Sequence, residues 1–154
     1  MPTRLTRQHV FYAFSAELQP ALTIQQGEEV LMETHDCFEG QLRSEQDLVT
    51  TLDWEHINPA TGPVYIRGVK AGDIVRVDLL EVNVADTSIM VTIPHEGALG
   101  DVITEMETVV LPIEGNEVVY KDKVRIPARP MIGVIGMAPA SGKVPNGTPG
   151  AHGG

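Results

Sequence analysis

Short runs of β-branched and other apolar residues, separated by Gly, Pro, Asn and Asp, make up most of this 154-residue chain. β-Branched residues favour strands, and those four turn residues end them. The chain is therefore predicted to be mainly β. The expected strands are His9 to Phe14, Glu29 to Thr34, Val64 to Val69, Asp73 to Val84, Ser88 to Ile93, Glu105 to Leu111, Glu117 to Pro127 and Met131 to Met137.

The fourth of these segments, Asp73 to Val84, has the clearest alternation. Odd-numbered residues from 75 to 81 share one face of the expected strand, and even-numbered residues from 74 to 82 share the other. The even-numbered set is more polar near its start, so we expect that face to meet solvent. Lys70 to Asp73 reads as the tight turn that precedes the strand.

Helix signals are scarce. The one expected helix, a short one, runs from Ser44 to Leu52, where Ser44 can cap and Asp47 can reach back to it. Many strands without long amphipathic helices favour an antiparallel sandwich or barrel over an α/β sheet. We expect one domain over residues 1–154, ending in a Gly/Pro-rich terminal loop over residues 138–154.

The charge balance excludes several classes of function. The formal net charge is −10 and no cluster of Lys and Arg occurs, which argues against binding to nucleic acid or an anionic membrane. No apolar run approaches the roughly 18 residues of a membrane span, and the single cysteine excludes an internal disulfide. A cytoplasmic protein is expected.

Three blocks in order resemble the acetamidase/formamidase family of linear-amide hydrolases. They are Glu33 to Gln41, Asn58 to Asp73, and Ile126 to Gly133 followed by Pro149 to Gly154. The resemblance runs from Val30 onward and corresponds to about the first half of a typical member. The family's Asn and Asp after the glycine pair are absent here. The resemblance implies a jelly-roll-like β-sandwich that hydrolyses formamide-type or acetamide-type substrates.

The segment Glu33 to Cys37 concentrates groups that can do chemistry. In a regular strand Glu33, His35 and Cys37 share one face, while Thr34 and Asp36 share the other. A bulge or the end of the strand can re-aim one of them. Asp36 is also a typical turn residue ahead of Gly40, and Glu33 and His35 also fit a solvated strand face. The resemblance favours a site role for Asp36.

His152 is the best single candidate for a metal ligand. Neutral imidazole binds zinc well, and glycines beside it clear space for a substrate. With Asp36 and a further carboxylate it forms the mixed N and O set that suits zinc or another divalent ion. Gly150 and Gly153 are expected to line the substrate. His9, His56 and His95 have no ligand-like spacing and are expected to be structural or exposed.

Cys37 is the alternative nucleophile, because some amide hydrolases use a thiolate. A reactive thiolate needs nearby cations or a base to lower its pKa, and no Lys lies near Cys37 in sequence. A lone cysteine is more often a small apolar residue. The loop at Asn58 to Pro63 and the pair Arg125 and Arg129 fit structural or surface roles as well as substrate contacts.

The resemblance implies metal-assisted cleavage of a small amide to a carboxylate and ammonia, with Asp36 and His152 as ligands and Glu33 as the proton carrier. A homo-oligomer or a second chain is expected to complete the fold. The competing hypothesis is a catalytically incomplete β-sandwich that serves as a binding or structural module.

Overall fold

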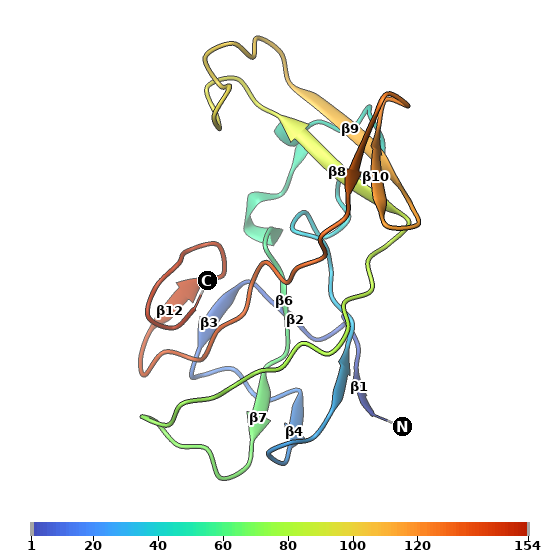
Figure 1. Ribbon diagram of the computed structural model, residues 1–154. Helices are drawn as coiled ribbons and strands as arrows, with labels where there is room; N and C mark the ends of the chain where they lie inside the picture. The colour runs from blue at the N-terminus through green and yellow to red at the C-terminus, as the bar shows by residue number, and fades with distance from the viewer. Residues whose placement is uncertain (1, 154) are drawn as a thin grey trace. The chain divides into compact units, whose positions relative to one another are not determined.

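The computed structural model describes residues 2–153 and is mainly β (Figure 1). About 31% of the chain is strand and 4% is helix, with several antiparallel sheets, which is consistent with a β-sandwich. The predicted fold class is confirmed. In the described range no helix has the length and apolar character needed to cross a membrane. The expected terminal loop ends at Gly154, which lies outside that range.

The chain forms two compact units, and each is described by itself. The first unit comprises Met1–Glu39, Trp54–Leu80 and Ile132–Gly154. The second comprises Gly40–Asp53 and Glu81–Met131. All of the predicted site residues belong to the first unit.

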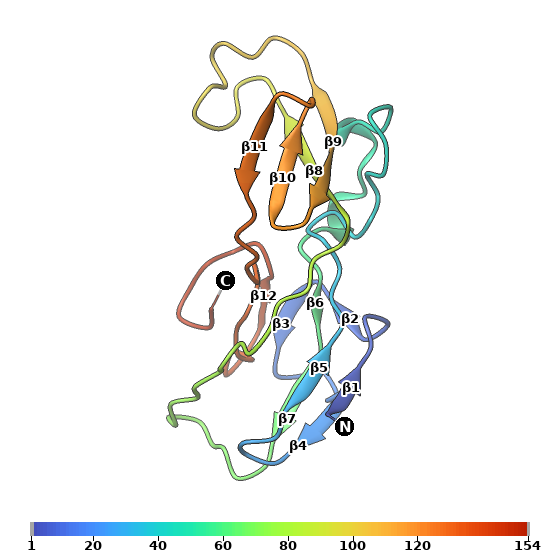
Figure 2. The ribbon, with the colours of Figure 1, turned by 45° about the vertical axis from the view of Figure 1, so that its right-hand side comes forward.

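Short strand pairs build the first unit (Figure 2). Two pairs are parallel and two are antiparallel, and the last strand returns from the far end of the sequence to pair with an early one. Phe14 and Leu5 are 5% and 3% exposed and form the apolar core. The pairs are β1 (Thr3–Leu5) with β5 (Val30–Met32), β4 (Leu22–Ile24) with β7 (Val64–Ile66), β2 (Val10–Phe11) with β6 (Ala60–Thr61), and β3 (Ala13–Ser15) with β12 (Lys143–Pro145).

One four-stranded antiparallel sheet, in the order β11, β10, β9, β8, forms the second unit. Alternate residues of β9 and β10 point inward, so Val109, Leu111 and Val119 are buried together with Leu42, Val49 and Leu52 from the preceding segment. The strands are β8 (Thr87–Thr92), β9 (Glu107–Glu114), β10 (Glu117–Tyr120) and β11 (Val124–Pro127), and the short 3₁₀ helices are η1 (Val49–Thr51) in this unit and η2 (Trp54–His56) in the first.

Several predicted strands differ from the observed ones. The expected strand Asp73 to Val84 is wrong, because these residues pair with no strand in the described part of the chain. Glu117 to Pro127 is a hairpin, since Lys121 and Asp122 take positive φ values of 47° and 54° and reverse the chain. Met131 to Met137 makes one isolated bridge, from Gly136 to Gly153.

The break in His9 to Phe14 lies at Tyr12, which separates β2 from β3. Four strands of two or three residues were not predicted, namely β1, β4, β6 and β12. Of these, β12 lies inside the expected terminal loop.

The expected helix Ser44 to Leu52 is reduced to η1. The Asp47 side chain accepts hydrogen bonds from the backbone N–H groups of Arg43 and Ser44, at 2.8 and 2.9 Å. These bonds lower the pKa of Asp47 and are the predicted contact back to Ser44, yet the helix that follows is limited to the three residues of η1.

Candidate active site

The terminal segment folds back onto the first unit and is anchored along its length. β12 pairs with β3 through Lys143 to Pro145, and the Asn146 N–H donates to the carbonyl of Tyr12 at 2.9 Å. Further on, the Met137 N–H donates to the carbonyl of His152 at 2.7 Å. His152 is therefore held by the fold and does not lie on a free tail.

The His152 ring packs between an aromatic ring and a glycine. Its centroid lies 5.2 Å from that of Phe14, at an interplanar angle of 57°. Only 3.0 Å separates Nδ1 from the place where a Cβ on Gly150 would stand. Nε2 is buried and has no hydrogen-bond partner among the described residues. A buried imidazole nitrogen without a partner is costly unless a ligand completes it.

Glycines allow the close approach that places His152. A Cβ on Gly136 would lie 2.7 Å from the His152 carbonyl oxygen, and one on Gly153 would lie 2.3 Å from the Ile135 carbonyl oxygen. Gly153 also has a φ of 130°, which other residues rarely adopt. Gly150 and Gly153 donate their N–H groups to each other's carbonyls at 2.8 and 3.0 Å. Both amides are therefore already used, and the side on which a Cβ would stand is filled at both glycines, by the His152 ring at Gly150 and by the backbone of Ile135 and Gly136 at Gly153. Their role in lining a substrate stays a prediction.

Asp36 heads a turn at the end of the segment that follows β5. Its Oδ1 accepts the Phe38 N–H at 2.8 Å, and its carbonyl accepts the Glu39 N–H at 3.0 Å. Both interpretations of Asp36 therefore remain compatible with its position: it shapes the turn, and it is an exposed carboxylate that can hold a ligand.

A pair of asparagines links the Asp36 turn to the terminal segment. The Asn58 N–H donates to the carbonyl of Cys37 at 2.7 Å, and the Asn58 carbonyl accepts Nδ2 of Asn146 at 2.9 Å. Nδ2 of Asn146 also donates to the carbonyl of Phe11 at 2.7 Å. Asn146 is 1% exposed. Two segments more than a hundred residues apart in sequence are thus tied to one loop.

Glu33 lies in an ion pair with Arg4. Its Oε1 accepts both Nε and a terminal guanidinium nitrogen of Arg4, the former at 2.8 Å. The hydrogen bond from Arg4 lowers the pKa of Glu33, with a smaller contribution from the backbone N–H of Arg7. His35 reaches the same neighbour, because its Nε2 lies 3.1 Å from the Arg7 carbonyl oxygen while Oε2 of Glu33 accepts the Arg7 N–H at 3.4 Å.

Cys37 lacks the surroundings of a reactive thiol. Burial raises its pKa, and the negative charge of Asp36 raises it further. A thiol whose pKa is raised is less ionised at neutral pH and is a weaker nucleophile. Cys37 is nevertheless exposed, so it is also not the small buried apolar residue that a lone cysteine usually is.

Within residues 2–153 no group of three or more His, Cys, Asp or Glu side chains is arranged to hold a metal ion. Asp36 and His152 therefore belong to no such group within the described residues, and their joint role as ligands stays a prediction. An imidazole nitrogen and a carboxylate oxygen are nevertheless the donor types that suit zinc, and the unpartnered Nε2 of His152 fits a ligand role.

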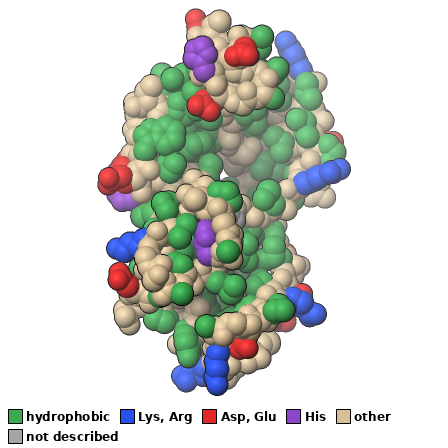
Figure 3. Space-filling view, turned by 90° about the vertical axis from the view of Figure 1, so that its left-hand side faces the viewer, with side chains coloured by type: hydrophobic (Ala, Val, Ile, Leu, Met, Phe, Trp, Pro, Cys, Tyr) green, Lys and Arg blue, Asp and Glu red, His purple; other side chains and the backbone are tan. Residues whose placement is uncertain are grey.

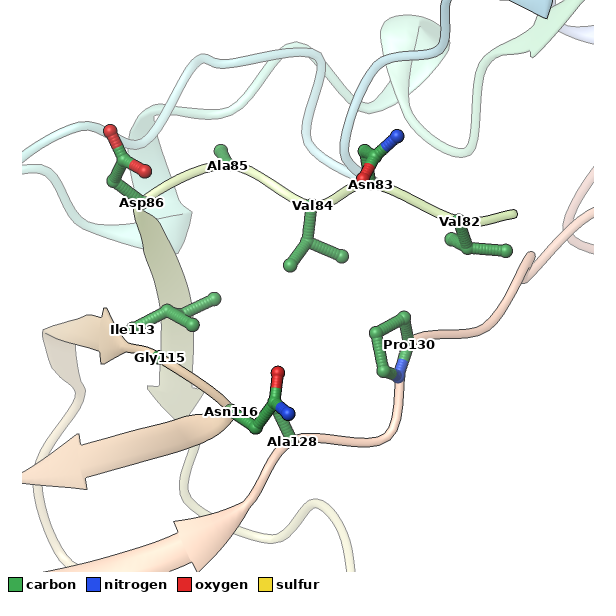
Figure 4. Close-up of a pocket in the computed structure, with 10 residues that line it drawn as sticks. All are labelled: Val82, Asn83, Val84, Ala85, Asp86, Ile113, Gly115, Asn116, Ala128 and Pro130. Carbon is green, nitrogen blue, oxygen red and sulfur yellow. The ribbon is translucent and has the colours of Figure 1, made fainter.

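The second unit contains an open cavity of about 300 Å³ beside residues 82–86 (Figure 4). The side chains of Val84, Ile113 and Pro130 face it, and Asn116 points into it from the turn between β9 and β10. None of the predicted site residues lines this cavity. Asp86 is the one titratable side chain among the residues that line it, so the lining offers no set of groups for amide hydrolysis.

Sequence reasoning missed Phe14 and Asn146 as residues that position the site. Phe14 reads as an ordinary strand residue, and Asn146 followed by Gly147 reads as a turn. The one sequence signal for Asn146 is its polar side chain inside a Gly/Pro-rich segment. Its hydrogen-bond partners are backbone carbonyls, and no pattern of side chains predicts such partners.

Comparison with known proteins agrees with these observations. The model of the acetamidase/formamidase family matches residues 2–146. The chain belongs to the acetamidase/formamidase family. No curated protein sequence matched the chain.

Three solved structures show how closely this family member follows the fold of its relatives. An acetamidase from Bacillus halodurans has a TM-score of 0.95 and 40% identity over 98% of this chain. A predicted acetamidase/formamidase from the thermophile Thermoanaerobacter tengcongensis has 0.94 and 39% over 100%. An acetamidase from Yersinia enterocolitica has 0.83 and 27% over 100%. In each case the match spans only 51% of the other chain, so this chain covers about half the length of these relatives.

Proposed function

We propose that this chain supplies the Asp36 and His152 side of an active site that hydrolyses small linear amides to a carboxylate and ammonia. Membership of the acetamidase/formamidase family supports amide hydrolysis. The observation that carries the site is the buried Nε2 of His152, which has no partner among the described side chains. Formamide-type and acetamide-type substrates are the candidates.

His152 and Asp36 are the residues that would hold a divalent ion, with zinc as our choice. Zinc bound there would polarise the amide carbonyl and lower the pKa of a water molecule. The chain's contribution is positional. Phe14 and Gly150 fix the imidazole plane, and the hydrogen bond from Met137 to the His152 carbonyl fixes the backbone. A ring held in this way loses little conformational freedom when it binds a ligand.

Glu33 is the candidate proton carrier. Its lowered pKa keeps it ionised at neutral pH, which is the form that accepts a proton. The ion pair with Arg4 also makes it a weaker base, so proton uptake would require that pair to loosen. Protonating the departing nitrogen allows it to leave as ammonia.

The rest of the site belongs, in our proposal, to polypeptide outside these 154 residues. Two ligands are too few for a catalytic zinc, which takes three protein ligands and leaves one position open. The relatives are about twice as long as the matched region. A second copy of the chain and a second polypeptide are both able to supply those ligands.

The test is ammonia release from formamide and acetamide by the natively assembled protein, with zinc content measured on the same samples. We expect His152→Ala and Asp36→Asn to lose zinc and at least about 100-fold of the turnover, because catalytic metal ligands are lost. Cys37→Ser is the matched control and should retain both.

Three results would contradict the proposal. The first is zinc retained in full by both ligand variants. The second is activity lost in Cys37→Ser alone, which would favour a thiol mechanism. The third is a wild-type assembly with neither zinc nor turnover, which would favour a non-enzymatic module.

A further inference from the structure

Residues 74–80 of the first unit lie outside every sheet. The turn before them closes with the Asp73 N–H donating to the Lys70 carbonyl at 3.0 Å. From residue 74 to residue 85 the backbone makes no backbone–backbone hydrogen bond with the described part of the chain. The backbone N–H and C=O groups of this run, drawn in yellow-green between β7 and β8 in Figure 1, are therefore unpaired with any strand of the described residues.

The side chains of this segment are those of a buried strand. Ile74 is 99% exposed and Leu80 is 73% exposed, while Val77 and Leu79 on the opposite face are 57% and 58% exposed. Apolar surface of this kind costs about 25 cal/mol per Å² while it faces water. Figure 3 shows hydrophobic side chains reaching the surface over much of one side of the molecule.

β11 is one edge strand of the second unit's sheet, and it carries charge. It pairs with β10 through four residues, and its Arg125 forms ion pairs with Glu114 and Glu117 at 2.8 and 3.4 Å. Charged side chains on an edge strand discourage further pairing. Residues 74–80 have no pairing strand in the described part of the chain, and their charges are confined to the even-numbered face, where Arg76 pairs with Asp78.

We propose that residues 74–80 form a β-strand that pairs with a strand from the part of the acetamidase fold outside these 154 residues. The Bacillus halodurans acetamidase retains this chain's fold at a TM-score of 0.95, yet 49% of its residues lie beyond the match. Those residues must pack somewhere, and a segment with strand sequence and two free edges offers both hydrogen bonds and apolar contact.

The alternation of side chains predicts which face the partner covers. The odd-numbered face carries Val75, Val77 and Leu79 and has no charge, whereas the even-numbered face carries the Arg76 and Asp78 pair, whose side chains are 84% and 59% exposed. Burying an ion pair is costly, so the apolar face is the one that packs.

In the second unit, considered by itself, residues 82–85 continue without backbone partners and border the open cavity of Figure 4. Val84 is 49% exposed there. The lack of partners is thus a property of the whole run from residue 74 to residue 85.

Hydrogen exchange tests the proposal directly. This chain is co-expressed with a polypeptide comprising the residues of the Bacillus halodurans acetamidase that it does not match, and amide exchange is compared with that of the chain alone. We expect alternate amides within 74–80 to exchange at least about 100-fold more slowly in the complex, as paired strands do. Equal protection at every amide would indicate strands on both edges and would also support pairing.

Two results would overturn the proposal: a complex in which amides 74–80 exchange as fast as in the chain alone, or protection that appears without the added polypeptide as the chain is concentrated. The latter would assign the strand to a second copy. If the two polypeptides fail to assemble, the aligned segment in the solved Bacillus halodurans acetamidase decides the question. Backbone hydrogen bonds from it to the unmatched part support the proposal, and their absence overturns it.

Variants at positions 76 and 77 test which face of the segment packs against the added polypeptide. Val77→Asp should weaken binding of the added polypeptide at least about tenfold, because a charge would be buried without a partner. Val77→Ile and Arg76→Gln should stay within about twofold. A tenfold loss in Arg76→Gln with none in Val77→Asp would contradict the predicted face. Because the experiment measures binding of the added polypeptide, its result does not depend on whether the protein hydrolyses amides.

Discussion

At the scale of single residues, the position of the terminal imidazole depends on Asn146. This side chain is buried and donates to the carbonyls of Phe11 and Asn58, so it joins the terminal segment to β2 and to the loop that contacts Cys37. Its Oδ1 has no hydrogen-bond partner among the described residues. The Nδ2 donor is therefore the end of the side chain that stabilises the fold.

Asn146→Ala should destabilise the chain by about 2 to 4 kcal/mol, because two buried carbonyls lose their donor. Asn83→Ala is the matched control, since Asn83 is exposed and bonds only to Glu81, and it should change the free energy of unfolding by less than about 0.5 kcal/mol. Urea unfolding measures both. Equal effects of the two substitutions would contradict the anchoring role.

Glu33 provides a second test at this scale. Its pKa lies below 4.5 because Arg4 stabilises the carboxylate, so the pair's stabilising effect is fully present above about pH 4.5 and is lost as the pH falls through the lowered value. In Arg4→Gln the pKa of Glu33 should rise towards 4.5, as followed by NMR titration of its side-chain carboxyl. An unchanged pKa would show that Arg4 is not the cause.

The sequence identified the segments of the candidate site better than the contacts inside it. Glycines on both sides of His152 indicated close packing, and the structure uses Gly136 and Gly153 for that purpose. The ion pair of Glu33 with Arg4 joins residues 29 positions apart, and no periodicity predicts such a contact. The roles of Asp36 and His152 as metal ligands stay predictions.

At the scale of secondary-structure elements, the bridge between Gly136 and Gly153 sets how closely the terminal segment approaches β3. Gly136→Ala should cost about 1 to 3 kcal/mol, because its Cβ would meet the His152 carbonyl oxygen at 2.7 Å and the Phe14 ring at 3.1 Å. Gly133→Ala is the control, since a Cβ there meets nothing within 4 Å.

The two glycine variants are compared by their thermal unfolding temperature and their affinity for zinc. Gly136→Ala should lower the unfolding temperature and weaken zinc binding, because the displaced His152 backbone moves its imidazole away from Phe14. Gly133→Ala should leave both close to the wild-type values. A Gly136→Ala protein as stable as Gly133→Ala would show that the terminal segment is not packed as described.

Strand prediction succeeded where a strand finds its partner nearby in sequence. β8 lies within one residue of its predicted segment at both ends and β9 within three, and the two strands pair with each other. The run from Asp73 to Val84 has the strongest alternation yet forms no ladder, because alternation reports a tendency to pair and not the presence of a partner. β1 and β4 were missed because three residues are too few to show a period.

At the scale of the whole molecule, the chain carries the fold of acetamidases over about half their length. The two candidate ligands lie in its first unit, as does the unpaired segment 74–80. If that segment pairs with the remainder of the fold, the same association would also bring further groups to the unit that contains Asp36 and His152. Assembly and catalysis would then be gained together.

In our proposal, His152 and Asp36 together hold one divalent ion. An anomalous difference map from crystals of the natively assembled protein grown with zinc tests this directly. We expect a single strong peak about 2.0 to 2.2 Å from Nε2 of His152 and from a carboxylate oxygen of Asp36. A peak that touches neither residue, or an unoccupied Nε2 in crystals that bind zinc elsewhere, would contradict it.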